Sequence, residues 1–421
     1  MERYSSYKDC GVSWIGDIPE HWEVKKIGSL FVERREKVSD KEYPALSVSK
    51  QGITPQLDTA VKTDNGDNRK KVCKNDFVVN SRSDRKGSCG VSPYTGSVSL
   101  INLVLSPRKN IEVEYFHHLF RSNDYIEEFY RIGRGIVADL WTTRYSEMRN
   151  IYIPLPPLDE QQAIVDYIDD KTSKIDAYVA DKEKEIELLQ ELKQKTIADA
   201  VTKGLNPDKK MKNSGISWIG EIPEHWEIRH LSQVSYEHYL SNKEVHHQNL
   251  LSLSYGRIIR KDINTTEGLL PASFDTYQIV EEGNIVMRLT DLQNDHKSLR
   301  VGLVKEEGIV TSAYVCLGVY DSVYPSYLYN VLHSYDIKKL FYSMGGGLRQ
   351  NLNWQGLKKL DIPLPPKDEQ QAIVAYIEEK CEKIDKLASE LQSEIDYLKE
   401  YKQRLIADCV TGQVNVQNEM I

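Results

Sequence analysis

Two strongly polar stretches of the chain, residues 159–203 and 368–412, carry apolar side chains at the three- and four-residue spacing of a long α-helix. In the second stretch a heptad frame gives two core series, formed by Ile377, Ile384, Leu391, Leu398 and Leu405 and by Val374, Cys381, Ala388, Ile395 and Lys402. The first stretch keeps the same frame more weakly, with the series Ile168, Ile175, Lys182, Leu189 and Thr196 and the series Val165, Thr172, Val179, Ile186 and Lys193. The pattern predicts two helices that pack on each other as a coiled coil, each roughly 67 Å long at 1.5 Å per residue.

The segments that precede these helices, residues 24–150 and 228–361, show the shorter periods of a mixed fold. The runs 75–79 and 283–287, and later 96–100 and 308–312, are strand-like. Apolar residues then follow at mainly helical spacing, namely Phe116, Leu119, Phe120, Ile126 and Phe129 in the first segment and Leu328, Val331, Leu332, Leu340 and Phe341 in the second. A glycine-rich loop comes next in both, at 133–135 and 345–347, five residues before Leu140 or Leu352. We predict one α/β (α+β) fold in both segments, carrying two different sets of loops.

The chain is an internal repeat. Residues 11–24 return at 215–228 with only Val/Ile and Asp/Glu exchanges, and residues 153–165 return at 362–374 with a single difference. A period of roughly 200 residues is too long for a solenoid, so each copy is predicted to be a whole module. Two like modules can be related by a pseudo-twofold axis, as the subunits of a dimer are, which suits a target in two parts.

Both repeated sequences are predicted to be mainly structural. The tryptophan boxes, residues 14–22 and 218–226, stand at the start of each module and contain a proline, which favours a plug against the helices over an aromatic stacking site. The glutamine pairs 161–162 and 370–371 fall in the first helical turn, where a structural or a partner-facing role remains open.

Composition predicts a soluble, cytoplasmic protein. No window approaches 18 consecutive apolar residues, and residues 1–6 have no apolar signal region. The six cysteines include no Cys-x-x-Cys spacing, so neither a zinc ribbon nor a disulfide framework is indicated.

The net charge of −8 is unevenly distributed along the chain. Residues 24–150 hold 22 Lys/Arg against 16 Asp/Glu, whereas residues 227–361 hold 14 against 15. The predicted helices hold 7 against 12 (159–203) and 6 against 11 (368–412), which together exceed the whole deficit. The first module therefore has a clear electrostatic preference for phosphate and the second only a local one.

Motifs for catalysis are absent from the sequence. There is no Gly-x-x-x-x-Gly-Lys-Ser/Thr phosphate loop and no Asn/Asp-Pro-Pro-Tyr/Phe signature of an amino-methyltransferase. The triple glycine at 345–347 lacks the spacing of a dinucleotide fingerprint. The adjacent histidine pairs 117–118 and 246–247 cannot share one helix face, so no metal site is predicted.

Basic loops interleaved with Asn, Gln and Ser instead indicate DNA binding. Arginine can contact guanine bidentately and Asn or Gln can contact adenine in the same way. The candidates are Arg69, Lys70, Lys71, Arg82, Arg85, Lys86, Arg134 and Arg144 in the first module and Arg257, Arg288, Asn294, Lys297, Arg300, Arg349, Gln350 and Asn351 in the second.

The two repeated boxes, 14–22 with 218–226 and 153–162 with 362–371, resemble the specificity subunit of type I restriction-modification enzymes over essentially the full length of the chain. This resemblance implies two target recognition domains, separated by two long antiparallel coiled-coil helices in a pseudo-twofold arrangement. The implied boundaries are a first recognition domain at 1–152, a first helical arm at 153–204, a linker and second recognition domain at 205–361, and a second arm with a tail at 362–421.

The resemblance also implies the function and the partners. A subunit of this family reads a bipartite, gapped sequence in double-stranded DNA and directs two methyltransferase subunits and the ATP-driven restriction subunits to it. S-adenosylmethionine, ATP and magnesium would be used by those partners, and this chain is expected to hold no cofactor and to carry out no catalysis.

Two other classes of function remain open from the residues alone. One is a stand-alone regulator with two DNA-binding modules, which would bind its site tightly without partners. The other is a coiled-coil scaffold that binds no DNA. Neither accounts for the repeated Leu-Pro-Pro-x-Asp-Glu-Gln-Gln sequence.

Overall fold

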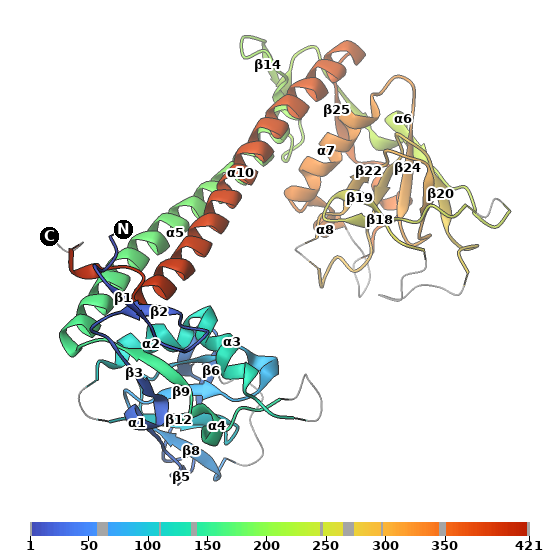
Figure 1. The fold of residues 1–421 in the computed structure, drawn as a ribbon. Helices are drawn as coiled ribbons and strands as arrows, with labels where there is room; N and C mark the ends of the chain where they lie inside the picture. Colours follow the sequence, from blue (N-terminus) through green and yellow to red (C-terminus); the bar gives the residue numbers. More distant parts are fainter. Residues whose placement is uncertain are drawn as a thin grey trace. The chain divides into compact units, whose positions relative to one another are not determined.

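A computed structural model gives the fold and describes residues 2–56, 66–108, 111–135, 141–244, 247–263, 273–295, 298–344 and 351–418. The chain forms two compact units, which are shown in Figure 1. Unit 1 consists of Met1–Glu183 and Ser393–Ile421, and unit 2 of Lys184–Gln392. The long helices α5 (Leu158–Lys203) and α10 (Lys367–Val410) therefore each contribute to both units.

Unit 1 is an α+β fold in which every named strand pair is antiparallel. Its main sheet has the order β10 (Cys89–Val91), β9 (Phe77–Asn80), β12 (Asn102–Pro107), β4 (Phe31–Glu33). The other strands pair as β11 (Gly96–Val98) with β8 (Arg69–Val72) and β5 (Lys37–Val38), β6 (Leu46–Ser49) with β7 (Gly52–Pro55), β13 (Tyr152–Leu155) with β3 (Glu23–Lys26), and β1 (Tyr7–Asp9) with β2 (Asp17–Pro19). The shorter helices are α1 (Ile27–Leu30), α2 (Val113–Arg121), α3 (Asn123–Arg131), α4 (Tyr145–Met148) and the 3-10 turns η1 (Ser83–Arg85) and η3 (Val416–Asn418).

Unit 2 repeats this fold. Its main sheet has the order β17 (Ser235–Glu237), β24 (Val315–Val319), β21 (Ile285–Met287), β22 (Val301–Leu303). The remaining antiparallel pairs are β20 (Gln278–Val280) with β23 (Gly308–Val310), β18 (Leu251–Ser254) with β19 (Arg257–Arg260), β16 (Glu227–His230) with β25 (Asp361–Leu364), and β14 (Met211–Asn213) with β15 (Glu221–Pro223). The helices are α6 (Leu231–Val234), α7 (Pro325–Ile337), α8 (Leu340–Met344) and α9 (Trp354–Leu357).

One interior strand of each main sheet, β9 in unit 1 and β21 in unit 2, is buried on both faces. In β9, Phe77 and Val79 pack in the same core as the helices, whereas Val78 packs with Val72 and Val98 of the neighbouring small sheet. The same alternation divides β21 between its two core clusters. Successive strand side chains point to opposite faces, so an unbroken apolar run is the pattern required between two layers.

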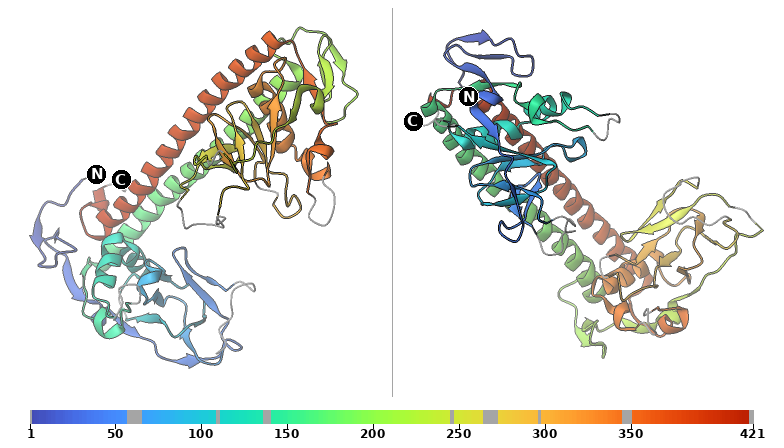
Figure 2. Two further views of the ribbon diagram at one scale, coloured as in Figure 1. Left: turned by 90° about the vertical axis from the view of Figure 1, so that its right-hand side faces the viewer. Right: turned by 90° about the horizontal axis from the view of Figure 1, so that it is seen from below.

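The two long helices pack along their length, as Figure 1 and Figure 2 show. All residues of the predicted heptad series are buried or half-buried, which confirms the predicted seam. Lysines at seam positions extend to acids of the facing helix: Lys402 Nζ lies 2.6 Å from Asp176 Oδ1 in unit 1, and Lys193 Nζ lies 2.7 Å from Asp385 Oδ1 in unit 2. In the first pair a residue near the end of α10 meets one in the first half of α5. In the second pair a residue near the end of α5 meets one in the first half of α10. The two helices therefore run antiparallel.

In unit 1 the tryptophan box closes the end of α10 against the start of α5. Trp22 is fully buried, and Gly412, which follows α10 with φ of 78°, lies beside it. His21 Nε2 lies 2.8 Å from Oε2 of Glu160, a buried residue in the first turn of α5 that also accepts a hydrogen bond from the Tyr4 hydroxyl. The predicted plug is confirmed here, and burying an indole of this size contributes about 5 kcal/mol.

Unit 2 has the same junction with the helices exchanged. Trp226 is fully buried beside Gly204, which follows α5 with φ of 72°, and His225 Nε2 lies 2.7 Å from Glu369 Oε2 in the first turn of α10. A glycine in the left-handed region is the usual way to end a helix, because it carries no Cβ to clash.

The first glutamine of each repeated pair is structural. Gln161 Oε1 accepts a hydrogen bond from the N–H of Glu112 (2.9 Å), just before α2, and its Nε2 donates to the carbonyl of Pro156 (2.8 Å). Gln370 makes the same pair of bonds, at the start of α7 and with the carbonyl of Pro365 (2.9 Å). These buried amides fix each recognition fold to the first turn of its helix, while the second glutamine of each pair is exposed.

Three predicted helices differ from the structure. The helix expected from Leu328 to Phe341 is two helices, because Lys339, between α7 and α8, has φ of 58°. The single helix expected from Phe116 to Phe129 is two helices, because Ser122 leaves helical geometry and caps α3 by accepting the N–H of Tyr125. The second long helix ends at Val410 rather than at 412, since Gly412 adopts a positive φ. The boundaries proposed for recognition domains and arms stay predictions.

Candidate nucleic-acid interface

Three loops of unit 1 that are distant in sequence lie side by side. The backbones of Arg134 and Thr142 exchange two hydrogen bonds of 3.2 and 3.0 Å. Thr143 N–H donates to the carbonyl of Ser81 (2.9 Å), and Ser83 N–H donates to the carbonyl of Trp141 (2.9 Å). The loop after β9, the glycine-rich loop and the segment before α4 therefore form one surface, which we call the unit 1 loop surface (residues 81–86, 133–135 and 141–144).

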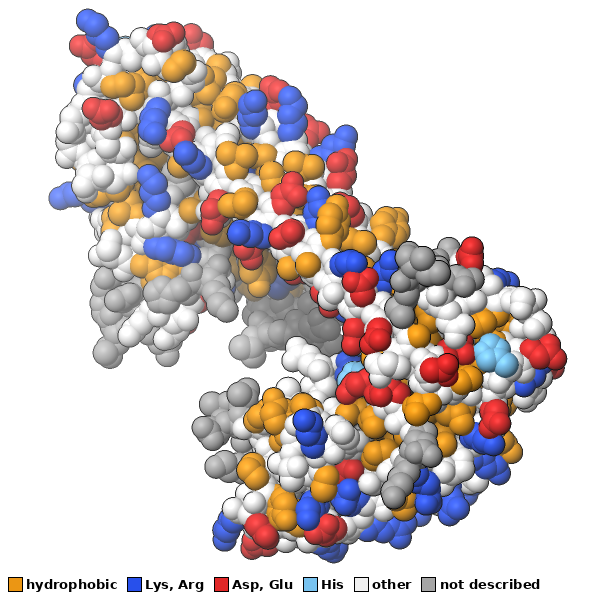
Figure 3. Space-filling view, turned by 90° about the vertical axis from the view of Figure 1, so that its left-hand side faces the viewer, with side chains coloured by type: hydrophobic (Ala, Val, Ile, Leu, Met, Phe, Trp, Pro, Cys, Tyr) orange, Lys and Arg blue, Asp and Glu red, His pale blue; other side chains and the backbone are white. Residues whose placement is uncertain are grey.

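Five of the predicted DNA-binding residues belong to this surface, namely Arg82, Arg85, Lys86, Arg134 and Arg144. Asp84 lies 3.0 Å from Arg82 and 3.9 Å from Arg85, and Lys86 pairs with Glu127 at 2.8 Å. These ion pairs are solvent-exposed and weak, so a phosphate group can replace the carboxylates. The face drawn in Figure 3 shows Lys and Arg side chains along the lower edge of unit 1, where Figure 1 places β5 and β8 and not this loop surface.

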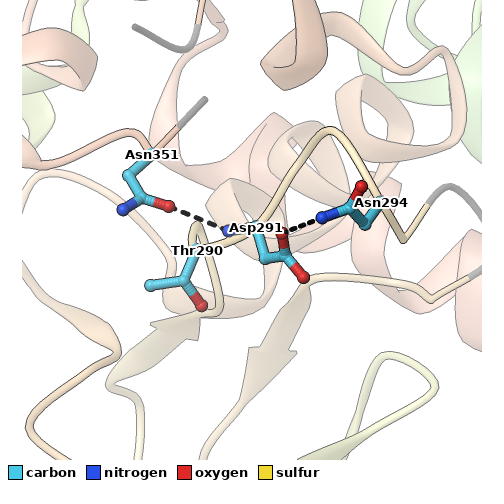
Figure 4. Close-up of a pocket in the computed structure, with 4 residues that line it drawn as sticks. All are labelled: Thr290, Asp291, Asn294 and Asn351. Atoms are coloured by element: carbon cyan, nitrogen blue, oxygen red, sulfur yellow. Dashed lines mark hydrogen bonds between the residues drawn. The ribbon is translucent and has the colours of Figure 1, made fainter. Parts of the chain in front are cut away.

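The equivalent place in unit 2 carries different chemistry. The loop after β21 meets the segment before α9, where Leu352 N–H donates to the carbonyl of Leu289 (2.9 Å). Figure 4 shows Asn351 Oδ1 accepting the N–H of Asp291 (2.9 Å) and Asn294 Nδ2 donating to Asp291 Oδ1 (2.7 Å). These residues and Thr290 line a cavity of about 450 Å³, which we call the unit 2 polar pocket. Asp291 has φ of 55°, a conformation that Asp tolerates better than most residues.

Hydrogen bonding shows which positions correspond. The bond from Leu352 to Leu289 matches the bond from Thr143 to Ser81, and a short helix follows in both units. Leu352 is thus the counterpart of Thr143 and not of Leu140, which lies outside the described residues. Equal spacing from the glycine-rich loops therefore does not make the two leucines equivalent positions.

Three candidate cations of the first module and one of the second belong to the folded scaffold. Arg69 is 5% exposed and donates to Ser97 Oγ (2.9 Å) and to the Ser97 carbonyl (3.0 Å); burial lowers its pKa. Arg300 is fully buried, so neither arginine is available to DNA in this conformation, which corrects their assignment as contact residues.

Lys70 and Lys71 are half-buried on β8. Lys70 donates to the carbonyl of Asn102 (2.8 Å), and Lys71 pairs with Glu36 (2.9 Å), a hydrogen bond that raises the pKa of Lys71. Their side chains belong to the small sheet and not to the unit 1 loop surface, because β8 pairs with β11 and β5.

The other candidates of the second module have different outcomes. Arg288 is half-buried beside the pocket, and Arg257 is exposed on the β18–β19 hairpin. Lys297, Arg349 and Gln350 lie outside the described residues. The pocket residues Thr290 and Asp291 were not predicted, because the prediction rested on cations and amides; a short Thr-Asp turn directly after a buried strand was the signal that could have identified them.

The described residues contain no group of three His, Cys, Asp or Glu side chains that could hold a metal ion. Within the same part of the chain, no helix is both long and apolar enough to cross a membrane.

Curated proteins are similar to this chain, two of them along most of its length and a third over part of it. The specificity subunit of the type I restriction enzyme MjaVIII of Methanocaldococcus jannaschii is 25% identical over 429 residues, which is 95% of each chain. The putative MjaX specificity subunit of the same organism is 25% identical over 435 residues, or 96% of each. The StySPI specificity subunit of Salmonella potsdam is 26% identical over 153 residues, 35% of this chain and 33% of that subunit.

Two solved structures share the fold. A chain from a structure on complex assembly and conformational transition of the type I R-M system has a TM-score of 0.69 at 14% identity, covering 94% of this chain and 99% of that one. The HsdS subunit of Thermoanaerobacter tengcongensis has a TM-score of 0.53 at 17% identity, covering 94% and 98%.

The family described as the type I restriction modification DNA specificity domain matches residues 19–188 and 304–397, more than half of the sequence. Because this match and the curated relatives extend over both repeats, the chain belongs to the type I restriction-modification DNA specificity family.

Proposed function

We propose that this chain reads a gapped DNA target through two equivalent surfaces, the unit 1 loop surface and the unit 2 polar pocket. Its family makes it a DNA sequence-recognition subunit and not the catalytic part of a restriction-modification system. The supporting observation is that one equivalent backbone hydrogen bond, from Thr143 to Ser81 and from Leu352 to Leu289, joins corresponding loops in the two units, while the loop side chains differ. Two similar backbone frameworks that carry different side chains are suited to recognise two half-sites of different sequence.

The side chains favour different bases in the two half-sites. Arginines such as Arg82 and Arg85 can contact O6 and N7 of guanine, whereas Asn294 and Asn351 can contact N6 and N7 of adenine, and Asp291 can accept from N4 of cytosine. Most contacts in such interfaces go to phosphate and fix the register, and few side chains choose the bases. We propose that each surface enters a major groove, with the two grooves about one helical turn apart.

The long helices are the natural spacer between half-sites in this proposal. At 1.5 Å per residue, the 46 residues of α5 span about 69 Å. In this proposal, the length of the coiled coil sets the number of base pairs between the two half-sites.

We further propose that the chain assembles with methyltransferase and restriction subunits, as the specificity subunits it is similar to are components of restriction enzymes. Two methyltransferase subunits would match the two units. S-adenosylmethionine, ATP and magnesium would be bound by those subunits, and this chain would supply only the choice of site.

The test is co-expression with the methyltransferase subunit encoded beside it, followed by genome-wide detection of modified bases with kinetic single-molecule sequencing. The expected result is one gapped, asymmetric motif with methyladenine in both halves. A complex that assembles without a motif would contradict DNA reading and favour a scaffold, and specific DNA binding without any complex would favour a stand-alone regulator.

A further inference from the structure

Arg300 is a buried cation whose position the DNA-reading proposal does not explain. It directly precedes β22 and is fully buried. Burying a guanidinium costs several kcal/mol unless its N–H groups find partners. The structure must therefore supply acceptors for its five donors.

Those acceptors are the backbone carbonyls of a single loop. Nη1 of Arg300 donates to the carbonyls of Arg288 (3.2 Å) and Thr290 (2.9 Å), and Nη2 donates to the carbonyl of Asp295 (2.5 Å). A longer contact of 3.5 Å reaches the carbonyl of Asp291. The side chain thus binds the loop after β21 from inside, at its first residues and again at Asp295.

Two further residues hold Arg300 in place. Tyr342 of α8 accepts from Nε (3.0 Å), stacks on the guanidinium with its ring centroid 5.3 Å from Cζ, and donates its own hydroxyl to the carbonyl of Asp295 (2.9 Å). Asp336 of α7 accepts the backbone N–H of Arg300, and burial raises the pKa of this carboxyl group. The loop is therefore tied through Arg300 to two helices of the unit 2 core.

The loop held in this way supplies three of the four residues of the unit 2 polar pocket, Thr290, Asp291 and Asn294. None of the hydrogen bonds between these residues and Arg300 uses their side chains. Arg300 therefore sets where the pocket side chains stand without bonding to those side chains.

Unit 1 shows what the same loop does without the arginine. Asn80 N–H donates to the carbonyl of Ser88 (2.9 Å), as Arg288 N–H donates to the carbonyl of Arg300 (2.9 Å), so Ser88 is the counterpart of Arg300. Eight positions separate the first pair and twelve the second, so the unit 2 loop is four residues longer. A longer loop has more interior carbonyls to satisfy, which explains why only unit 2 carries the arginine.

We infer that Arg300 is a positioning residue for specificity: it holds the loop after β21 in the conformation that presents Thr290, Asp291 and Asn294 to the second half-site, without contacting DNA. This inference rests on the proposed function. Lysine cannot replace it, because a single ammonium group lacks the planar fork that reaches several carbonyls at once.

The test compares Arg300→Lys and Tyr342→Phe with the unchanged chain, each co-expressed with the methyltransferase subunit and profiled by single-molecule sequencing. In Arg300→Lys, methylation of sites with one wrong base in the half read by unit 2 should rise about tenfold relative to correct sites, the size of one weakened base choice. The half read by unit 1 should keep its base preference. Tyr342→Phe should relax the same half to a smaller extent.

The matched control is Arg260→Lys, an arginine of the same unit that is exposed and paired with Glu306. It should leave the motif unchanged. An unchanged motif in Arg300→Lys, or an equal loss of methylation at correct and incorrect sites, would overturn the inference, because a merely structural role lowers activity without altering base preference.

If Arg300→Lys fails to fold or to assemble, Tyr342→Phe decides: relaxation of the second half supports the inference and an unchanged motif overturns it. Failure of the proposed function is separate, since it would appear as the absence of any gapped motif with the unchanged chain.

Discussion

Arg82, Arg85 and Lys86 follow the central strand of unit 1, whereas the stretch 290–294 of unit 2 carries Thr, Asp and Asn at the same place in the fold. In both units one backbone hydrogen bond joins the corresponding loops, whereas the unit 2 loop is also held by the side chains of Asn351 and Arg300. The comparison shows that main-chain hydrogen bonds and the helix junctions maintain the fold common to both units. The side chains of the loops can therefore differ between the units.

The two units also differ in how they can use phosphate. The segment 24–150 has six more cations than acids, while 227–361 has one more acid than cations. Affinity from phosphate contacts is therefore expected to come mainly from unit 1, and unit 2 is expected to contribute choice of bases with little salt dependence.

The largest effect is expected when one surface is moved relative to the other. Inserting one heptad into each long helix, near Lys182 and near Leu391, keeps the seam in register and adds about 10 Å. The gap in the methylated motif should widen by about three base pairs, at roughly 3.4 Å each, with both half-sites unchanged. The original motif should lose its methylation. An unaltered gap in the sequencing profile would show that the helices do not set the spacing.

Removing cations from unit 1 should weaken DNA binding strongly. The double change Arg134→Ala and Arg144→Ala is expected to reduce the affinity of the assembled complex about 100-fold at low salt and to lower the salt slope by about 2. Titration of labelled DNA at several salt concentrations measures both quantities. Arg131→Ala is the control, because that exposed side chain of α3 pairs with Glu128 (2.6 Å) outside the loop surface. A salt slope that does not change would contradict the assignment of phosphate contacts to unit 1.

The two helix junctions should differ in their tolerance of a side chain. A Cβ at Gly412 would lie 2.4 Å from Cδ of Pro19, while a Cβ at Gly204 would meet the Trp226 ring only at 3.2 Å. Gly412→Ala should lower the free energy of unfolding by about 2–3 kcal/mol and Gly204→Ala by about 1–2 kcal/mol. Thermal or urea unfolding measures the difference.

Gly11→Ala separates backbone strain from crowding at these junctions. Gly11 has φ of 68°, and beyond its chain neighbours no atom lies within 4 Å of the place that a Cβ would take. Its substitution should therefore cost only the strain of the left-handed backbone, about 1 kcal/mol. Equal losses in all three variants would show that crowding against Pro19 contributes nothing.

In unit 2 a smaller change should affect base choice alone. Asn351→Ala removes both the acceptor for Asp291 N–H and the amide donor, and should relax one position of the second half-site about tenfold without altering the salt slope. Asn351→Asp keeps the acceptor and loses the donor, so its comparison with alanine separates loop positioning from base contact. A relaxed base preference in the first half-site would contradict the assignment of this pocket to the second half-site.

The smallest effect is expected from pH. Burial lowers the pKa of His117 in unit 1 to about 3 and that of His333 in unit 2 to about 4, from 6.5 in the unfolded chain. Below about pH 6.5 the unfolded state binds a proton that the folded state does not, so stability falls as the pH is lowered. Between about pH 7 and 5.5 each histidine should cost about 1 kcal/mol. Unfolding of His117→Gln and His333→Gln at both pH values should show a smaller loss than the unchanged chain; an equal loss would refute the assignment.

The sequence was most informative where geometry is local or repeated. The heptad series identified the seam of α5 and α10, and the duplicated boxes identified the junctions, because both depend on residue spacing along one element. The split between α2 and α3 was missed, although Ser122 followed by Asn and Asp is a recognisable cap.

The sequence was least informative about which cations are exposed. Arg69 and Arg300 have the same chemistry as Arg134, and it is the folded chain that brings Ser97 to one and the loop carbonyls and Tyr342 to the other. Burial of a long polar side chain is decided by tertiary structure, so periodicity within one segment cannot report it.

The division of the chain has a consequence for its synthesis. Unit 2 is one continuous segment, whereas unit 1 needs residues 393–418, among them Asn415, whose N–H donates to the carbonyl of Glu2 (3.0 Å). During translation, unit 1 therefore stays incomplete on the ribosome until unit 2 and the residues after it have emerged. Its exposed core around Trp22 must wait for the end of α10, so the order of folding is the reverse of the order of synthesis.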